Sequence, residues 1–327
     1  MRTVIITIGV LFLVSCQEPK CRETPIASQP VDVTFDRLES ELFAAQSQEE
    51  VVNFLQTNPA FASLFLDAAE YPNLEVLANK IFKLTSDPFV DTLYNEAISE
   101  FSDFSKIEES VSDAAGRIKT LVPGMKDITI QTAVTGLYKD LYISDTLVIV
   151  GLDFFIGDDA SYPPMNIPQY ILDRYDKEHL PVTIVKFLSA SLVSKGKNET
   201  LISEMVDFGK TYYLLSRLMP CTPDSLIIGY SPKQMETVLD NEAIIWANFV
   251  ENEVLYDANH LTKRKFLGER PNVYEISQEC PGRIGAWIGW RVVESYMRNN
   301  NEVTLEQLIS ERDNDLIFRK SSYKPKG

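Results

Sequence analysis

The chain has 327 residues and a formal net charge of −16, from 31 lysine and arginine residues against 47 aspartate and glutamate residues. Hydrophobic residues make up 45% and charged residues 24% of it, which is typical of a folded domain and excludes a disordered chain. The acidic excess argues against nucleic acid as a partner, because nucleic-acid-binding proteins need basic surface to neutralise phosphates. The only histidines are His179 and His260, so the His-Glu-x-x-His string of a zinc peptidase helix is absent, and we expect no metal and no other cofactor.

The first 15 residues have the pattern of a lipoprotein signal peptide. A short positive start precedes residues 4–14, which are almost wholly apolar but too few to span a bilayer, since a spanning helix needs about 20. The segment ends in Leu13-Val14-Ser15-Cys16, which resembles the bacterial lipobox, where a peptidase cuts before a lipid-bearing cysteine. An ordinary secretory peptide is the alternative, but the position, the length and all four residues favour lipid attachment at Cys16.

The residues after the cysteine indicate location and spacing. Gln17 follows Cys16, where lipoproteins kept at the inner membrane usually have aspartate. The sequence therefore predicts a membrane-anchored lipoprotein of the bacterial cell envelope, at the outer membrane and facing the periplasm. Residues 16–30 contain three prolines among small and polar residues, which predicts a flexible tether between the lipid and the domain.

Three cysteines remain for the folded part. Cys221 and Cys280 are each flanked by proline, and an exported protein allows a disulfide between them. Two separate free thiols are the equally supported alternative, because sequence alone cannot place the Cα atoms within bonding distance.

Residues 31–327 are predicted to form one domain that is helical over 35–122, strand-rich over 125–157 and helical again over 167–327. Ser47 and Glu50 form the ends of a capping-box pattern, and apolar residues recur at helical spacing through 61–82. Two β-branched runs, 128–130 and 147–150, indicate strands. Because strands and helices do not alternate repeatedly, we expect a small antiparallel sheet in an α+β fold that is predominantly helical.

The last part contains further helix signals. Ser231 and Pro232 predict a capped helix start, and Pro281-Gly282-Arg283 opens a helix through Arg298. In that helix Gly285 and Gly289 lie four residues apart, so they leave a smooth strip that the backbone of a neighbour can approach.

Several strings in the later part of the chain occur in an order typical of one family. They are Gly151-Leu152-Asp153-Phe154-Phe155-Ile156-Gly157, Pro168-Gln169-Tyr170-Ile171-Leu172 with Arg174-Tyr175, Phe208-Gly209-Lys210 with Tyr213, Ile228-Gly229-Tyr230, Asn241-Glu242 with Ile245-Trp246, Pro281-Gly282-Arg283-Ile284-Gly285 with Trp287-Ile288-Gly289-Trp290, and Ser321-Ser322-Tyr323-Lys324-Pro325. Behind a lipobox, and over about residues 31–325, they resemble the gliding-motility lipoprotein GldB family of the Bacteroidetes. The resemblance implies a lipid-anchored component of surface gliding, with other gliding or type IX secretion components as partners.

The same family is distantly similar to zinc peptidases of the gluzincin type, which implies a degenerate zincin-like fold. Such enzymes hold zinc with two helical histidines one turn apart. The helix expected in that place, residues 182–193, offers Lys186, Ser189 and Ser191 but no histidine. Glu204 and Asp207 stand where the resemblance places a third ligand. We therefore expect a peptidase scaffold without its metal, and no enzyme.

Other residues with chemical potential have simpler interpretations. His179 lies in an acidic segment and is expected at the surface, and Asp257 with His260 is expected to form a pair on a helix surface. Asp153 lies among apolar residues and must find hydrogen-bond donors, which favours a structural role in the following turn. Thr92, Thr146 and Ser225, each between aspartate and leucine, resemble the acceptor pattern for O-glycosylation in this bacterial phylum.

The leading hypothesis is a non-catalytic interaction or scaffold protein of the gliding apparatus. Two alternatives stay open. One is a hydrolase, independent of metal or with a site that the sequence does not reveal. The other is an outer-membrane lipoprotein that binds a ligand between exposed aromatic side chains.

Overall fold

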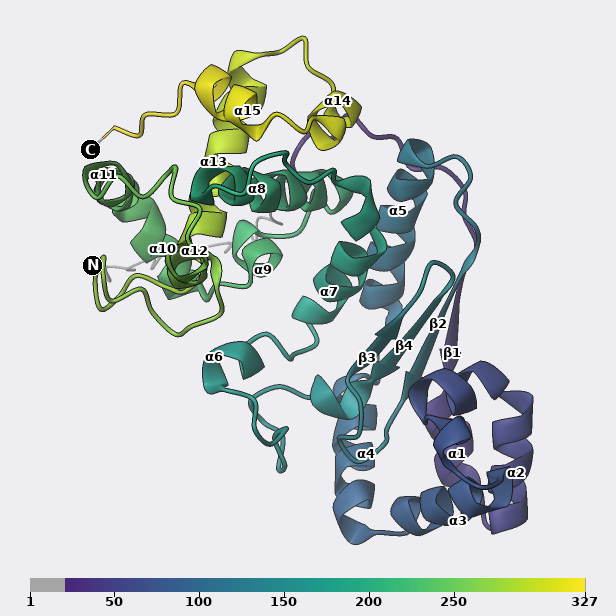
Figure 1. The fold of residues 1–327 in the computed structure, drawn as a ribbon. Coiled ribbons are helices and arrows are strands. Elements are labelled where there is room, and N and C mark those ends of the chain that lie inside the picture. Colours follow the sequence, from purple (N-terminus) through teal and green to yellow (C-terminus); the bar gives the residue numbers. More distant parts are fainter. Residues whose placement is uncertain (1–20, 327) are drawn as a thin grey trace, which may run out of the picture.

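The computed structural model describes residues 21–326, and Figure 1 shows them as a small sheet between two helical parts. The first helical part contains α1 (Leu38–Ala44), α2 (Gln48–Thr57), α3 (Leu74–Thr85) and α4 (Pro88–Glu100), and α5 (Ser105–Leu121) runs from it along the sheet. The second contains α6 (Gln169–Leu172), α7 (His179–Leu188), α8 (Leu201–Leu218), α9 (Asp224–Ile228), α10 (Pro232–Asp240), α11 (Glu242–Glu251), α12 (His260–Leu267), α13 (Ile284–Asn299), α14 (Leu305–Ser310) and α15 (Asn314–Ser321). The predicted α+β class with mostly helical structure is confirmed.

The sheet is mixed and not antiparallel. Its order is β1 (Val33–Arg37), β2 (Ile128–Ala133), β4 (Leu147–Gly151) and β3 (Leu141–Ile143). β1 pairs parallel with β2, β2 pairs parallel with β4, and β3 alone pairs antiparallel, with β4. The prediction of an antiparallel sheet is wrong, because α1–α5 together form one long crossover between the first two strands. That crossover hides the strand–helix alternation, and β1 extends into the segment 35–122 that was expected to be helical.

The first helical part has a core of its own. Ser47 caps α2 by accepting a hydrogen bond from the Glu50 N–H at 3.2 Å, whereas the Glu50 carboxylate accepts from the Gln46 N–H and so completes no capping box. The apolar residues predicted to pack together do so, with Phe61 and Phe65 fully buried. These two residues are the first and last of a short π-helix, Phe61–Phe65, and the centroids of their rings lie 5.6 Å apart.

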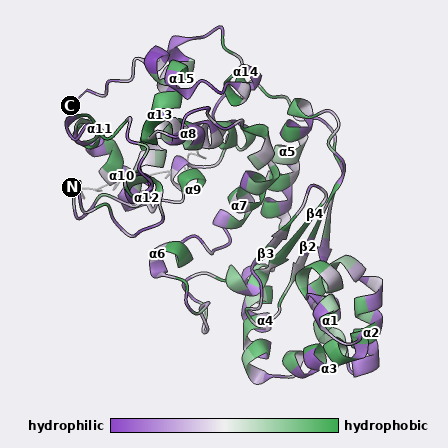
Figure 2. Cartoon of the chain, viewed as in Figure 1, coloured by the Kyte–Doolittle hydropathy of each residue, from purple (hydrophilic) through white to green (hydrophobic). Residues whose placement is uncertain are grey.

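The second core is centred on the crossing of α8 and α13. Gly289 approaches the carbonyl oxygen of Met205, and Gly209 approaches the carbonyl oxygen of Gly289, so a Cβ at either glycine would collide with backbone. Gly285 faces Phe266 and Leu267 of α12. The predicted smooth strip therefore exists, and it allows the backbones of α8 and α13 to contact each other within one chain. Figure 2 shows both hydrophobic and hydrophilic residues on the helices of this part of the molecule.

Residues 21–30, here called the N-terminal strap, are attached to the domain. Cys21 forms a disulfide with Cys221, the Thr24 hydroxyl donates to the Arg217 carbonyl at 2.8 Å, and the Gln29 N–H donates to the Gly116 carbonyl at 3.0 Å. Ile26 is buried between these contacts. The prediction of a flexible tether over 16–30 is wrong for residues 21–30, and its first five residues lie outside the described part.

The two alternatives predicted for Cys221 and Cys280, a disulfide between them or two free thiols, are both wrong. Cys221 pairs with Cys21 across 200 residues of sequence, so neither a Cys221–Cys280 disulfide nor a free Cys221 exists. Cys280 is a buried free thiol, and its burial raises the pKa to about 12. The Cys21–Cys221 pairing follows from the docking of the strap, which the proline-rich composition of 16–30 did not indicate.

Candidate functional site

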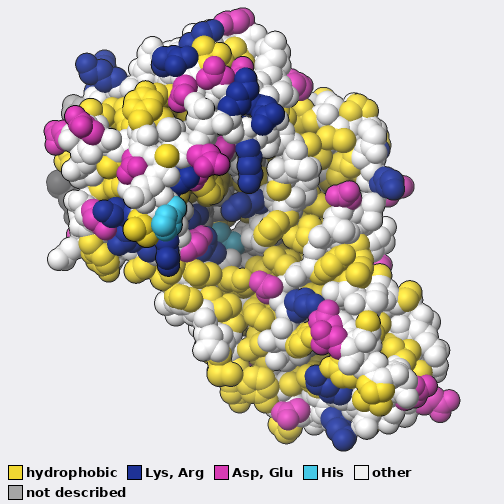
Figure 3. All heavy atoms as spheres, viewed as in Figure 1, with side chains coloured by type: hydrophobic (Ala, Val, Ile, Leu, Met, Phe, Trp, Pro, Cys, Tyr) yellow, Lys and Arg dark blue, Asp and Glu magenta, His cyan; other side chains and the backbone are white. Residues whose placement is uncertain are grey.

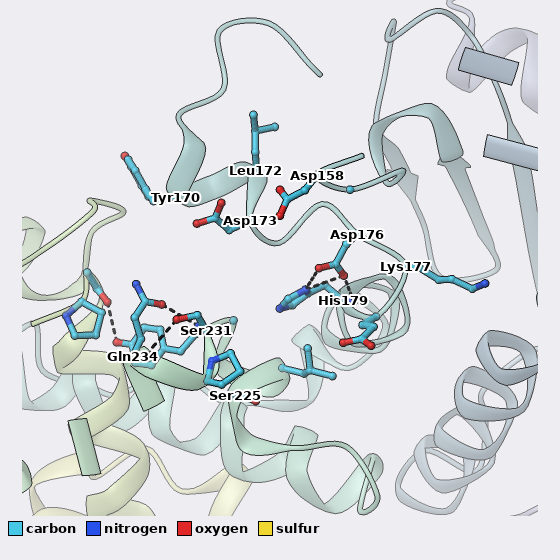
Figure 4. A pocket seen from close by; sticks show the side chains of 18 of the residues that line it. Asp158, Tyr170, Leu172, Asp173, Asp176, Lys177, His179, Ser225, Ser231 and Gln234 are labelled. Carbon is cyan, nitrogen blue, oxygen red and sulfur yellow. Dashed lines mark hydrogen bonds and ion pairs between the residues drawn. The ribbon is translucent and has the colours of Figure 1, made fainter. Parts of the chain in front are cut away.

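A large cleft lies between the segment that contains α6 and the start of α7, on one side, and α9, α10 and the start of α13, on the other. Its volume is about 730 Å³. Figure 3 shows the molecule hollowed between its second helical part and the part that contains the sheet. Figure 4 shows polar residues around this space, among them Asp158, Asp173, Asp176, His179, Ser231 and Gln234.

Arg283 forms the floor of the cleft and links its walls. Its backbone is left-handed, with φ of 58°, at the residue that precedes α13. Its guanidinium donates to the carbonyl oxygens of Ile228 at 2.6 Å and Gly229 at 2.9 Å, and it lies 5.4 Å from the centre of the Tyr230 ring. Only 8% of the residue is exposed. A planar donor fork suits two neighbouring carbonyls that end a short helix, which explains why this position uses arginine and not lysine.

A second arginine closes the same wall through a shared carboxylate. Arg174 donates both guanidinium NH2 groups to Glu269, at 3.0 and 2.9 Å, and Arg283 Nε lies 3.5 Å from the same carboxylate. Gly229 has φ of +70°, and a Cβ there would collide with the Arg174 side chain. The Tyr230 hydroxyl donates to the Gly282 carbonyl at 2.8 Å. Segments far apart in sequence are thus held together by charged hydrogen bonds, which are about twice as strong as neutral ones.

His179 lies at the start of α7 and points into the cleft (Figure 4), contrary to the expected surface position. Its Nδ1 lies 2.9 Å from each carboxylate oxygen of Asp176. Burial raises the pKa of Asp176, but the hydrogen bond and charge of His179 outweigh burial and hold that pKa below its usual value. Nε2 is buried and has no partner among the described residues. In the neutral imidazole, a Nδ1–H bond to the carboxylate would leave Nε2 as an acceptor, whereas the charged ring donates from both nitrogens.

The cleft as a whole is acidic. Its lining includes seven carboxylate residues against three lysines and arginines. Asp158 and Asp159 are exposed on the rim and form no ion pair within residues 21–326. Within the described part of the chain, the Asp173 carboxylate accepts only from the Gln169 amide, at 2.9 Å. A ligand with positive charge or several donors would complement this lining.

Asp153 has the structural role that the sequence predicted. It is 1% exposed, and its carboxylate accepts from the backbone N–H groups of Thr135 at 3.2 Å and Leu137 at 2.6 Å. Burial raises the pKa of Asp153 to about 6, against the opposing effect of these hydrogen bonds. The residue fixes the turn between β2 and β3, in which Gly136 and Leu137 both have positive φ.

The two residues considered as a third zinc ligand, Glu204 and Asp207, form ion pairs and hydrogen bonds with neighbouring groups. Glu204 pairs with Lys263 at 2.6 Å. Asp207 accepts from the Gly196 N–H at 2.9 Å and from the Asn314 amide at 2.8 Å. Across residues 21–326, no three histidine, cysteine or acidic side chains gather closely enough to hold a metal ion.

Around the expected metal helix, α7 ends at Leu188, and Lys186, Ser189 and Ser191 occupy its C-terminal end and the 3-10 turn that follows. The Ser189 hydroxyl donates back to the Val185 carbonyl at 2.8 Å. The expected helix over 182–193 is therefore shorter than predicted. Asp257 precedes α12 and accepts from the Thr262 hydroxyl, so it does not form the expected pair with His260.

The remaining candidate residues are dispersed. Thr92 lies within α4, Thr146 is exposed in the turn before β4, and Ser225 lies in α9 on the wall of the cleft. O-glycosylation of these three stays a prediction. Cys16 lies outside the described residues. Between residues 21 and 326 no helix combines the length and apolarity that a membrane span requires.

The family strings pair with one another in space. Glu242 accepts from Arg291 at 3.0 Å and from the Tyr323 hydroxyl at 2.8 Å, and the ring centroid of Trp246 lies 5.1 Å from that of Tyr323. A family model described as gliding motility protein GldB matches residues 20–325. The chain belongs to the GldB family of gliding-motility lipoproteins. The match spans the strap, the sheet and both helical parts, which confirms the resemblance over the folded chain.

No curated protein and no solved structure matches this member of the GldB family. Its similarity to zinc peptidases therefore stays a prediction.

Sequence reasoning named Arg174, Gly229, Tyr230 and Arg283 as parts of family strings but did not place them at one site. It missed Glu269 entirely, because that residue lies in none of the strings. The sequence did contain a signal for such a partner, because Arg174 and Arg283 stand in largely apolar strings and a buried guanidinium requires a carboxylate partner. The position of His179 could not be read from its acidic surroundings, because α9, which lines a hollow together with it, is about 45 residues away in sequence.

Proposed function

We propose that this GldB-family protein is anchored through a lipid on Cys16, at the outer membrane and facing the periplasm, and acts without catalysis as a binding component of the gliding apparatus. The partner is another gliding or type IX secretion component, and its binding site is the cleft above Arg283. One observation carries this proposal: strings from separate parts of the chain that bear the family resemblance meet at this cleft.

The charge arrangement supports binding. Arg174, Glu269 and Arg283 satisfy one another and the ends of α9, so they stabilise the walls and offer little free charge. The rim carboxylates of Asp158 and Asp159 face solvent, and a positively charged segment of a partner protein would neutralise them. Rim charges of this kind mainly affect association rate and specificity.

Gene replacement in a host that glides tests the binding role. Asp158→Lys with Asp159→Lys reverses the rim charge at exposed positions, so the fold should be kept. We expect gliding to be lost while protein level and membrane attachment stay normal. Glu109→Lys with Glu302→Lys makes the same charge change at exposed positions outside the cleft, and this matched control should glide normally. Normal gliding of the rim variant would contradict the proposal.

Two further measurements test its other parts. Cys16→Ser should release the protein from the membrane fraction, and mass spectrometry of the wild-type amino terminus should show acyl chains on Cys16. Purified full-length protein should neither contain stoichiometric zinc nor turn over peptide substrates. Bound zinc together with turnover would instead support the hydrolase alternative.

A further inference from the structure

A second hollow, of about 590 Å³, lies where α11, α13 and the C-terminal residues 322–326 meet. The C-terminus and α11 lie at the same edge of the molecule in Figure 1. Its lining contains four basic residues, Arg291, Arg298, Lys324 and Lys326, against two acidic ones. This is the reverse of the charge balance of the chain, which has a net charge of −16.

The positive charge here is available to an external partner. Arg298, Lys324 and Lys326 are exposed, and within residues 21–326 none of them forms an ion pair. Two large apolar side chains stand beside them, with Leu239 49% and Ile244 65% exposed. Exposed aliphatic side chains flanked by lysine and arginine are typical of protein surfaces that rest on anionic lipid.

The N-terminal strap is linked to the same region through charged side chains of α9 and α13. Arg22, the residue after Cys21, pairs with Asp224. Glu294 of α13 connects this ion pair to the hollow. Its carboxylate accepts from Arg291 at 2.5 Å, and the charges of Asp224 and Arg22 both affect its pKa. Arg291 lines the hollow and is one helical turn from Glu294.

The distance to the lipid is short because the strap is fixed. Only four residues separate the lipid-bearing Cys16 from Cys21, and the five Cα–Cα steps between them span at most about 18 Å. A free tether over 16–30 would have allowed about 50 Å on the same basis and no preferred orientation. The disulfide therefore restricts which faces of the domain can meet the membrane.

We propose that the face around this second hollow, with Ile244, Leu239, Arg298, Lys324 and Lys326, is the surface on which the anchored domain rests against anionic lipid headgroups. This inference rests on the lipid attachment that is part of the proposed function. Its consequence is a fixed orientation, in which the first cleft keeps one position relative to the membrane and is presented to partners from there.

The test uses full-length acylated protein in vesicles of phosphatidylethanolamine and phosphatidylglycerol. A fluorophore is attached at Ile244→Cys, and the matched control is Met165→Cys, which is 85% exposed in the loop before α6, away from α11 in Figure 1. Cys280 is buried and should stay unlabelled. Nitroxide-headgroup lipids should quench the label at 244 at least twofold more than the label at 165.

A charge variant then separates docking from anchoring. Arg298→Gln, Lys324→Gln and Lys326→Gln together should shift the docked equilibrium on the order of a hundredfold and lower quenching at 244 to the level at 165. The variant should still float with the vesicles, because its lipid is intact. Equal quenching at 244 and 165 in the unaltered protein, or quenching that the charge variant leaves unchanged, would overturn the proposed face. Wild-type protein that fails to float would instead refute the lipid anchor itself.

Discussion

Replacement of Arg283 by methionine tests whether the buried guanidinium holds the cleft together. Methionine keeps most of the aliphatic volume but leaves the carbonyl oxygens of Ile228 and Gly229 without their donors. Each lost hydrogen bond to a charged group costs about 1.5–3 kcal/mol at a buried site. The loss of one partner from a buried charged network costs about 3–5 kcal/mol overall. We therefore expect the free energy of unfolding to fall by about 4 kcal/mol.

The assay is thermal and denaturant unfolding of the purified protein, followed by tryptophan fluorescence. The three tryptophans lie on α11 and α13, so the signal reports on the second core, which contains the site. A loss of about 4 kcal/mol corresponds to a melting temperature lower by about 6 °C in a chain of this size. Arg174→Met is the matched control. It breaks an ion pair to the 44% exposed Glu269 side chain, and such pairs contribute about 0–1 kcal/mol.

The left-handed backbone of Arg283 gives a second, independent comparison. At φ of 58° an alanine carries a steric cost of about 1–2 kcal/mol that glycine avoids. Arg283→Gly should therefore be more stable than Arg283→Ala by about 1 kcal/mol, although glycine normally destabilises. A methionine variant within 1 kcal/mol of wild type, or an alanine variant more stable than the glycine variant, would refute the reasoning.

Three further changes test other parts of the structure. Gly289→Ala should lower the free energy of unfolding by about 3 kcal/mol or prevent folding, because its Cβ would collide with backbone, whereas Gly124→Ala, with open space around it, should be neutral in the same denaturant titration. The pKa of Asp153 is raised to about 6 by burial, so the folded state binds more protons than the unfolded state between about pH 4 and 6, and stability falls as pH rises through that window. In the wild type this lowers the free energy of unfolding by about 1 kcal/mol between about pH 5 and 7.5, and Asp153→Asn should remove that decrease. If the free energy of unfolding changed equally with pH in both proteins, the raised pKa of Asp153 would be contradicted. Non-reducing peptide mapping should recover Cys21 linked to Cys221, and serine at both positions should destabilise the fold by up to about 5 kcal/mol, because that bond closes a loop of 200 residues; recovery of either cysteine as a free thiol would disprove the pairing.

Local chemistry made the helical parts of this protein predictable. Ser231 accepts from the Gln234 N–H, and Pro232 occupies the first turn of α10, as the sequence indicated. The regular apolar spacing of 61–82 also identified residues that share one core. These features depend on neighbours within about four residues, so the order of residues alone determines them.

The sheet was predictable only in part. The runs at 128–130 and 147–150 are strands, but β1 at Val33–Arg37 was missed, because its pattern of burial is irregular and its partner β2 lies about 95 residues later. Pairing direction depends on where the chain returns, and no local pattern encodes that.

The sequence by itself determined the acidic composition, the export and lipobox pattern, the helix caps, the glycine strip of α13 and the family strings. Only the tertiary structure decided that Cys21 pairs with Cys221, that a cleft encloses His179 and its neighbour Asp176, and that Glu269 joins Arg174 to Arg283. The physical reason is range: periodicity and caps act over one or two helical turns, whereas disulfides, buried ion pairs and clefts require groups that folding brings together from distant positions.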